Sequence, residues 1–290
     1  MHNNASDHVI VGIDGSHAAR SAALWGAQEA ASRGGQLRLI YVVDSELVSP
    51  MPSEAYRVQL DKGKAALTAA RNDVLACVPA LKVTTDVFQG DPAGVLLAES
   101  RFASMICVGS NGIGRFARAF LGSTAEIVAN HAACSVAVIR SAETAQSVNY
   151  QPQFVIAPVT VFADNSTIIE AAVSRARHHH SPVLALGVKD NDLGATPREV
   201  LDEMVEQWRQ AYPDVRCNSV ATTAGGDSFV RHHPEISTIV ELNPAVQQDI
   251  SALVGRIRRP LTAIEQLVVI LEREHVETAP SAPDATSARG

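Results

Sequence analysis

Aromatic residues and excess positive charge are scarce in this 290-residue sequence. Aromatic side chains make up 4% of the chain. That leaves few surfaces on which single-stranded bases could stack. The formal net charge is −7, whereas proteins that bind the nucleic-acid backbone normally present a basic surface. We therefore expect no nucleic-acid partner.

Long apolar runs and metal-type spacings are also missing. No apolar run approaches the ~18 residues that a membrane span needs, and the opening MHNNASDH lacks the apolar centre of a signal peptide. The four cysteines show no CxxC spacing. The adjacent histidines at 178–180 would point to different faces of a helix, which does not favour metal binding. These absences predict a soluble, reduced, cytoplasmic protein with no metal site and no membrane contact.

What is present is a regular alternation of strand and helix patterns. In the first half, short apolar runs alternate with helical periodicity; the runs are 8–14, 36–44, 83–89, 104–110 and 135–141. Such an alternation predicts a parallel, doubly wound α/β sheet. Local signals agree with it: Asp91 is expected to cap a helix whose first position is Pro92.

The second half repeats this pattern. QFVIAPV (153–159) matches HVIVGID (8–14), and further strand-like runs follow at 181–189, 215–222, 237–242 and 266–272. Helical patterns lie at 164–180, 196–211 and 244–264. We therefore predict two tandem five-stranded parallel, doubly wound sandwich domains, at 1–145 and 150–276. The Pro/Ala/Ser-rich tail at 277–290 is expected to be disordered.

The stretch 109–124, GSNGIGRFARAFLGST, carries the strongest functional pattern. Gly109 and Gly112 could turn backbone N–H groups toward an anion, and Arg115 and Arg118 could contact phosphate. The segment Gly122-Ser123-Thr124 offers either a simple helix cap or an anion site at a helix N-terminus. If strands one and four are neighbours, the loops 12–16 and 109–112 face one crevice at a point where strand order reverses. The pattern predicts a polyphosphate cradle.

The glycine spacing resembles a known signature. Gly109-x2-Gly112-x9-Gly122-Ser123 is similar to the ATP-binding motif of universal stress proteins, and VGIDGS (11–16) and YVVD (41–44) resemble other blocks of that family. The resemblance covers nearly the whole chain as a tandem pair. It implies the five-stranded parallel α/β fold of the adenine-nucleotide α-hydrolase type, and ATP as the ligand.

The resemblance also implies roles for individual residues. Gly12 and Asp14 would contact the adenosine. Val42 and Val108 would line the adenine pocket. Ribose and phosphates would be held by Gly109, Ser110, Gly112, Gly122, Ser123 and Thr124, with Arg115 a further phosphate contact. Asn111 and Arg118 depart from the residues usual in the family, and whether Mg²⁺ accompanies the nucleotide stays open.

The second half departs much further from the signature. Val159 stands where Asp14 is expected, and Glu241 and Pro244 stand in place of the first two glycines. A carboxylate would repel phosphate, and proline has no N–H to offer. Gly255 is one residue out of register and is followed by Arg256. We expect this half to keep the fold without the nucleotide site.

Three functions are compatible with these residues. No Walker A motif, dinucleotide fingerprint or convincing catalytic triad is present, so we expect no catalytic residues and at most slow ATP hydrolysis. The resemblance favours an ATP-dependent stress sensor or regulator with an unidentified regulatory protein partner. The alternatives are a nucleotide-independent interaction scaffold and, with less support, an enzyme that adenylates a substrate or cleaves ATP.

The fifth strand of each half suggests how the halves assemble. SVAVIRS (135–141) and QLVVILE (266–272) are apolar and would lie near a sheet edge, which normally has to be covered. In universal stress proteins such strands pair antiparallel between domains. The resemblance therefore implies an intrachain pseudo-dimer, and two chains could form a homodimer through the same edges.

Overall fold

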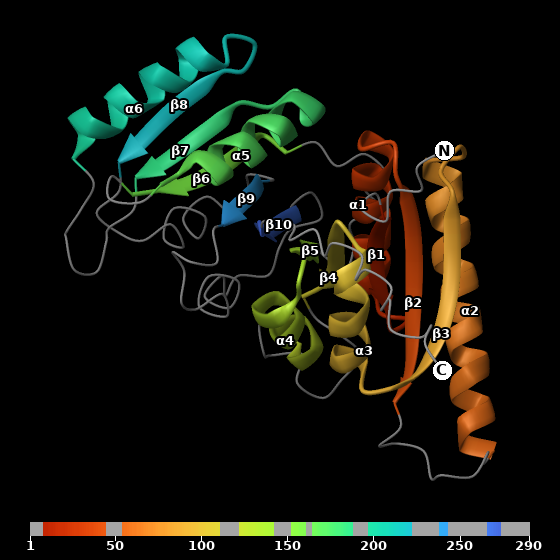
Figure 1. Ribbon diagram of the computed structural model, residues 1–290. Helices are drawn as coiled ribbons and strands as arrows, with labels where there is room; N and C mark the ends of the chain where they lie inside the picture. Colours follow the sequence, from red (N-terminus) through yellow and green to blue (C-terminus); the bar gives the residue numbers. More distant parts are fainter. Residues whose placement is uncertain are drawn as a thin grey trace, which may run out of the picture.

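A computed structural model shows one central sheet with helices on both faces (Figure 1). We refer to the described residues before 142 as the first half and to those after 151 as the second half. The residues that the structure describes are 8–44, 54–110, 122–141, 152–160, 164–187, 197–221, 238–242 and 266–273.

The first half contains five strands and four α-helices, as the sequence pattern predicted. They are β1 (His8–Ile13), α1 (His17–Ser32), β2 (Gln36–Asp44), α2 (Glu54–Cys77), β3 (Val83–Gly90), α3 (Pro92–Glu99) with a 3-10 turn at Ser100–Phe102, β4 (Met105–Gly109), α4 (Ser123–His131) and β5 (Ser135–Ser141). The expected cap is present, because the Asp91 carboxylate accepts the Gly94 N–H at 2.7 Å and Pro92 opens α3.

The described part of the second half contains five strands and two helices. They are β6 (Phe154–Val159), α5 (Ser166–His179), β7 (Val183–Gly187), α6 (Arg198–Ala211), β8 (Cys217–Ala221), β9 (Thr238–Leu242) and β10 (Gln266–Leu271). The helix expected at 244–264 and the tail at 277–290 lie outside the described residues.

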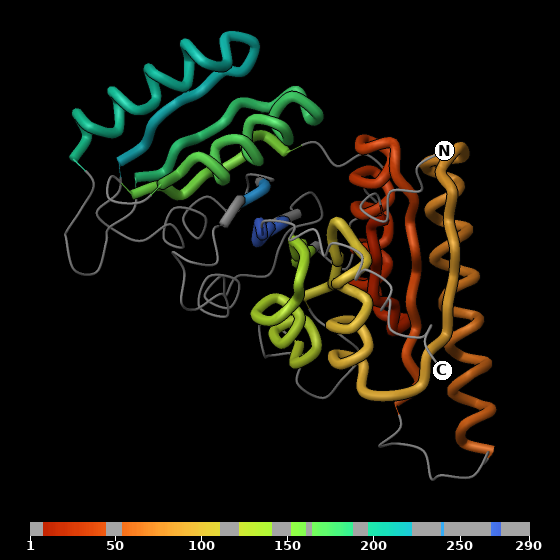
Figure 2. The backbone as a smooth tube through the Cα atoms, in the orientation of Figure 1, coloured from red at the N-terminus to blue at the C-terminus, as the bar shows by residue number. Residues whose placement is uncertain are grey.

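The strands follow the order β3-β2-β1-β4-β5-β10-β9-β6-β7-β8. All pairs within a half are parallel, and β5 pairs antiparallel with β10. Strands one and four are therefore neighbours in both halves, as the crevice hypothesis required. Figure 2 shows the blue β10 beside the yellow-green β5, where the two halves meet.

This order corrects one expectation about assembly. β5 lies between β4 and β10, and β10 lies between β5 and β9. Neither strand has a free edge, because β5 and β10 of the same chain pair with each other. A homodimer formed through the strand-five edges is therefore incompatible with this structure, whereas the expected antiparallel pairing of the two strands is present.

The ladder registers also show which residues of the two halves correspond. β1 and β6 share one burial pattern, and Val9 pairs with Met105 as Val155 pairs with Ile239. Val9 thus corresponds to Val155. Asp14 then corresponds to Thr160, and the predicted match with Val159 was wrong by one residue. Two apolar runs of equal length can be aligned with or without a one-residue shift, and only the pairing of each strand with its neighbours decides between the two alignments.

The same registers correct the second predicted match. Glu241 lies beside Ile270 and Val240 beside Ile156, so Glu241 takes the position of Cys107 and not that of Gly109. The counterpart of Gly109 is residue 243, outside the described residues. The prediction for Glu241 was therefore wrong by two residues.

Alternation along the strands divides the core between two faces of the sheet. One face packs against α1, α2, α5 and α6 through strand residues such as Val9, Leu39 and Cys107. The other face packs against α3 and α4 through residues such as Ile10, Ile40 and Val108. This second face leads to the carboxyl ends of β1 and β4, where the candidate site lies.

Candidate nucleotide-binding site

The candidate site lies where the strand order reverses in the first half. β1 and β4 are parallel neighbours, and β2 and β5 flank them on opposite sides (Figure 1). Their carboxyl ends therefore open at the same edge of the sheet, the usual ligand position in such folds. Asp14 follows β1 there, and Ser110 follows β4.

An apolar wall forms on the face covered by α3. A Cβ placed on Gly12 would lie 3.1 Å from Leu96 Cδ1 and 4.0 Å from Val108 Cγ1. Val108 is buried, and Val42 packs against the same cluster. The predicted residues Gly12, Val42 and Val108 thus share one face. Leu96 joins them, although sequence reasoning did not single it out; the apolar VLL run of α3 (95–97) was its only signal.

Asp14 shapes the turn between β1 and α1. Its Oδ1 accepts the Ser16 N–H at 2.8 Å, and Ser16 Oγ accepts the Ala19 N–H at 3.1 Å as the helix cap. The Asp14 side chain is exposed. Burial and the charge of Asp14 together raise the pKa of Tyr41, which places this phenol in the electric field of the carboxylate. The structure thus shows a bracing role for Asp14, and contact with adenosine stays a prediction.

Gly109 is required by packing. A Cβ at this position would lie 2.6 Å from the Ala18 carbonyl carbon and 2.8 Å from its oxygen. Among the described residues, the glycines with positive φ are Gly15, Gly34 and Gly90, so Gly109 does not adopt a left-handed conformation. The first turn of α1 can therefore approach the end of β4 only because residue 109 has no side chain.

The two ends of the glycine-rich segment are joined by backbone hydrogen bonds. Gly122 N–H donates to the Ser110 carbonyl at 2.9 Å, and Ser110 N–H donates to the Ile139 carbonyl at 2.9 Å. Ser110 is 1% exposed. Residues 111–121, which include the predicted contacts Gly112, Arg115 and Arg118, lie outside the described residues. The structure nevertheless holds the start of α4 directly beside the end of β4.

The start of α4 is the anion-binding candidate. Gly122 is the N-cap residue, with φ −66° and ψ 148°, and it makes no side-chain capping bond. Ser123 is exposed and Thr124 is half-buried in the first turn. Gly122 thus caps α4 through its backbone, since its carbonyl accepts the Glu126 N–H at 2.9 Å, which agrees with the simpler prediction of a helix cap. Anion binding at this helix end stays a prediction. First-turn amides of a helix carry partial positive charge and favour anions.

The described part of the chain offers neither a metal cluster nor a membrane-spanning helix. Within those ranges, no group of three or more His, Cys, Asp or Glu side chains is arranged to hold a metal ion. Nor is any helix there long and apolar enough to cross a bilayer.

The relatives of the chain identify its family. The model of the Universal stress protein family matches residues 6–140. Universal stress protein Rv2624c of Mycobacterium tuberculosis is 36% identical over 267 residues, which span 91% of this chain and 96% of that protein. The chain belongs to the universal stress protein family.

Further similarities agree with this membership. Universal stress protein Rv3134c of Mycobacterium tuberculosis is 36% identical over 235 residues, covering 77% of this chain and 82% of the relative. The crystal structure of a universal stress protein from Archaeoglobus fulgidus matches 92% of this chain and 97% of its own with a TM-score of 0.68. Its sequence identity is 14%, so this likeness shows the universal stress protein fold alone.

The second half differs at the position where β6 ends. Thr160, the counterpart of Asp14, is 4% exposed, and its carbonyl accepts a hydrogen bond from Asn165 Nδ2 at 2.8 Å. Asp164 instead accepts the Ser166 N–H at 2.9 Å, at the start of α5. The carboxylate that braces this turn thus lies later in the chain than Asp14 does in the first half.

Proposed function

We propose that the first half of this universal stress protein binds one ATP molecule at the carboxyl ends of β1 and β4. The observation that carries the proposal is the position of the α4 N-terminus. It has a glycine cap and a direct hydrogen bond from Gly122 to Ser110. That arrangement brings an anion-favouring helix end next to an apolar wall, which is the pairing of surfaces that a nucleotide needs.

The apolar wall suits the base of the nucleotide. Val42 and Val108 lie on the same face, and Gly12 leaves the strand surface without a side chain between them. Burial of apolar ligand surface contributes roughly 25 cal/mol per Å². We place the adenine ring against this wall, with the ribose near Asp14.

The helix end suits the phosphates. The first-turn amides of α4, together with the Ser123 and Thr124 hydroxyls, offer donors at a point where the helix dipole favours negative charge. Each such interaction is typically worth about 0.3–1 kcal/mol when exposed and more when shielded from water. Arg115 and Gly112 belong to the adjoining segment and complete the proposed phosphate contacts.

We propose that occupancy, rather than turnover, is the signal. The sequence contains no Walker A motif and no evident nucleophile–base pair for rapid hydrolysis. α1 starts at the Ser16 cap beside the site, and its last turn carries Glu29, which contacts the second half. A bound nucleotide could therefore influence the surface presented to a protein partner. This would make the protein an ATP-dependent regulator of the stress response.

Calorimetry of nucleotide-stripped, full-length protein tests the proposal. We expect a single ATP site in the wild type and at least about tenfold weaker binding in Gly122→Glu, because the new carboxylate would lie at the phosphates. Asn130→Glu is the matched control: it adds the same charge at the exposed last turn of α4 and should leave binding unchanged. Circular dichroism confirms that each variant is folded. Absent ATP binding in the wild type, or equal affinity in Gly122→Glu, would contradict the proposal.

A further inference from the structure

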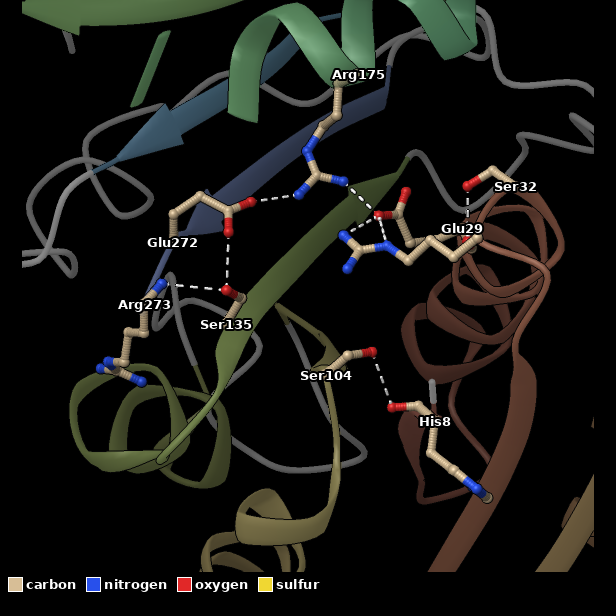
Figure 3. Close-up of polar contacts among 9 residues, drawn as sticks. His8, Glu29, Ser32, Ser104, Ser135, Arg175, Glu272 and Arg273 are labelled. Carbon is tan, nitrogen blue, oxygen red and sulfur yellow. Dashed lines mark hydrogen bonds and ion pairs between the residues drawn. The ribbon is translucent and has the colours of Figure 1, made fainter. Parts of the chain in front are cut away.

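A row of alternating charges crosses the joint between the two halves. In the first half, Arg33 Nε donates to Glu29 Oε1 at 2.7 Å; both residues lie at the end of α1. Glu29 Oε1 also lies 2.5 Å from Nη1 of Arg175 on α5. Arg175 then pairs with Glu272, which follows β10. Figure 3 shows the Arg175 guanidinium between the carboxylates of Glu29 and Glu272.

The contact between Glu29 and Arg175 is an ion pair that joins the two halves. Both side chains are 5% exposed, so this is a buried ion pair. Burial would raise the pKa of Glu29, but Arg175 and Arg33 lower it to about 2, so the carboxylate is charged at neutral pH. Ser135 of the first half adds a hydrogen bond at 2.8 Å to Glu272.

Glu29 and Arg175 occupy corresponding positions in the two halves. They are 146 residues apart, the same spacing that relates Val9 to Val155 in the ladder registers. Ala137 and Ile270 also correspond, since Ser135 pairs with Met105 as Val268 pairs with Ile239. Ala137 and Ile270 face each other directly in the β5–β10 ladder. The halves are thus related by an approximate two-fold axis through that pair.

The approximate two-fold symmetry determines which side chains would meet if two identical halves paired with each other. If two first halves met through β5, each residue would face its own copy near the axis, and Glu29 would meet Glu29. If two second halves met through β10, Arg175 would meet Arg175. Like charges in a buried contact are strongly unfavourable. Only the mixed pairing places the carboxylate of one half against the guanidinium of the other half.

We propose that Glu29 and Arg175 make the β5 face of the first half specific for a second half and exclude a second copy of the first half. A buried ion pair is weak evidence for stability, since desolvation offsets much of its attraction. Its clearest effect is on the choice between partners, because wrong pairings leave like charges together. The inference concerns the joint alone and does not depend on nucleotide binding.

Native mass spectrometry of the nicked protein tests partner choice. A protease site is placed between residues 145 and 150 of the full-length chain, and the folded protein is cleaved. Unlabelled and ¹⁵N-labelled samples are then mixed in mild urea so that halves exchange. We expect first–second pairs to make up nearly all of the wild-type complexes, with labelled and unlabelled halves exchanged between them. In Glu29→Gln, first–first pairs should rise at least about fivefold, since the carboxylates no longer repel.

A matched control separates partner choice from general damage to α1. The Arg20–Asp73 ion pair joins α1 to α2 within the first half, so Arg20→Gln with Asp73→Asn removes a pair from the same helix without touching the joint. This variant should behave as the wild type. The proposal fails if the wild type already forms like pairs in statistical proportion, or if Glu29→Gln still forms mixed pairs alone. Dissociation of Glu29→Gln into single halves would also overturn it, because the pair would then be needed for association itself.

Discussion

At the scale of single residues, His179 is a half-buried titratable group whose pKa responds to Glu29 and Arg175 at the joint. It takes the position of Arg33 in the second half, at the same spacing that relates Glu29 to Arg175. Burial lowers its pKa to about 4; His178, Arg175 and His180 act in the same direction, whereas Glu29 opposes them. The second half thus holds a neutral imidazole where the first half holds a guanidinium.

This shift predicts a pH-dependent stability. Between about pH 6.5 and pH 4 the unfolded chain binds a proton at His179 that the folded chain does not, so stability falls as pH is lowered through this window. The loss amounts to at most about 3 kcal/mol. His179→Gln should flatten the dependence of the unfolding free energy on pH between 7 and 4.5, measured in urea. His131→Gln, at an exposed histidine in the last turn of α4, is the control; an equally steep dependence in His179→Gln would refute the assignment.

At the scale of secondary-structure elements, the crossing of α1 over the end of β4 positions the site. Gly109 allows the first turn of α1 to approach, and the same turn carries the Ser16 cap and the Asp14 brace. The backbone of Ser110 then holds the start of α4. The glycine that fits the nucleotide signature is therefore also a packing requirement of the fold.

Substitution of the two strand glycines separates backbone contact from side-chain contact. In Gly109→Ala the new methyl group would meet the Ala18 backbone at 2.6 Å, which cannot move without shifting α1. In Gly12→Ala it would meet the flexible end of Leu96 at 3.1 Å. We expect Gly109→Ala to lower the unfolding free energy by about 3 kcal/mol and Gly12→Ala by about 1 kcal/mol, in urea titrations. Equal costs would mean that α1 does not constrain residue 109.

The elements themselves were largely predictable from the sequence, but their registers were not. β-branched runs, the Asp91-Pro92 helix start and the alternation of strands with helices indicated every strand of the first half. The match of Asp14 to Val159 was wrong because buried parallel strands are apolar on both faces, and periodicity then gives no register. The contacts of Leu96 and Ala18 depend on how helices cross the sheet, which no local pattern records.

At the scale of the whole molecule, one ten-stranded sheet joins a half whose sequence carries the nucleotide signature to a half whose sequence does not match it. The resemblance to universal stress proteins predicted the antiparallel joint, and the ladder shows it. The ion pair between Glu29 and Arg175 was not predictable, since neither residue belongs to a motif and their proximity arises only from the two-fold arrangement. The family model matches residues 6–140, the half in which we place ATP.

The most direct test of that placement is photoaffinity labelling of the intact chain with 8-azido-ATP, followed by mapping of the modified peptides. We predict that label appears in first-half peptides containing Val42 or Val108, and that excess ATP displaces it. Label shared equally between the halves, or label that excess ATP does not displace, would contradict an ATP site confined to the first half.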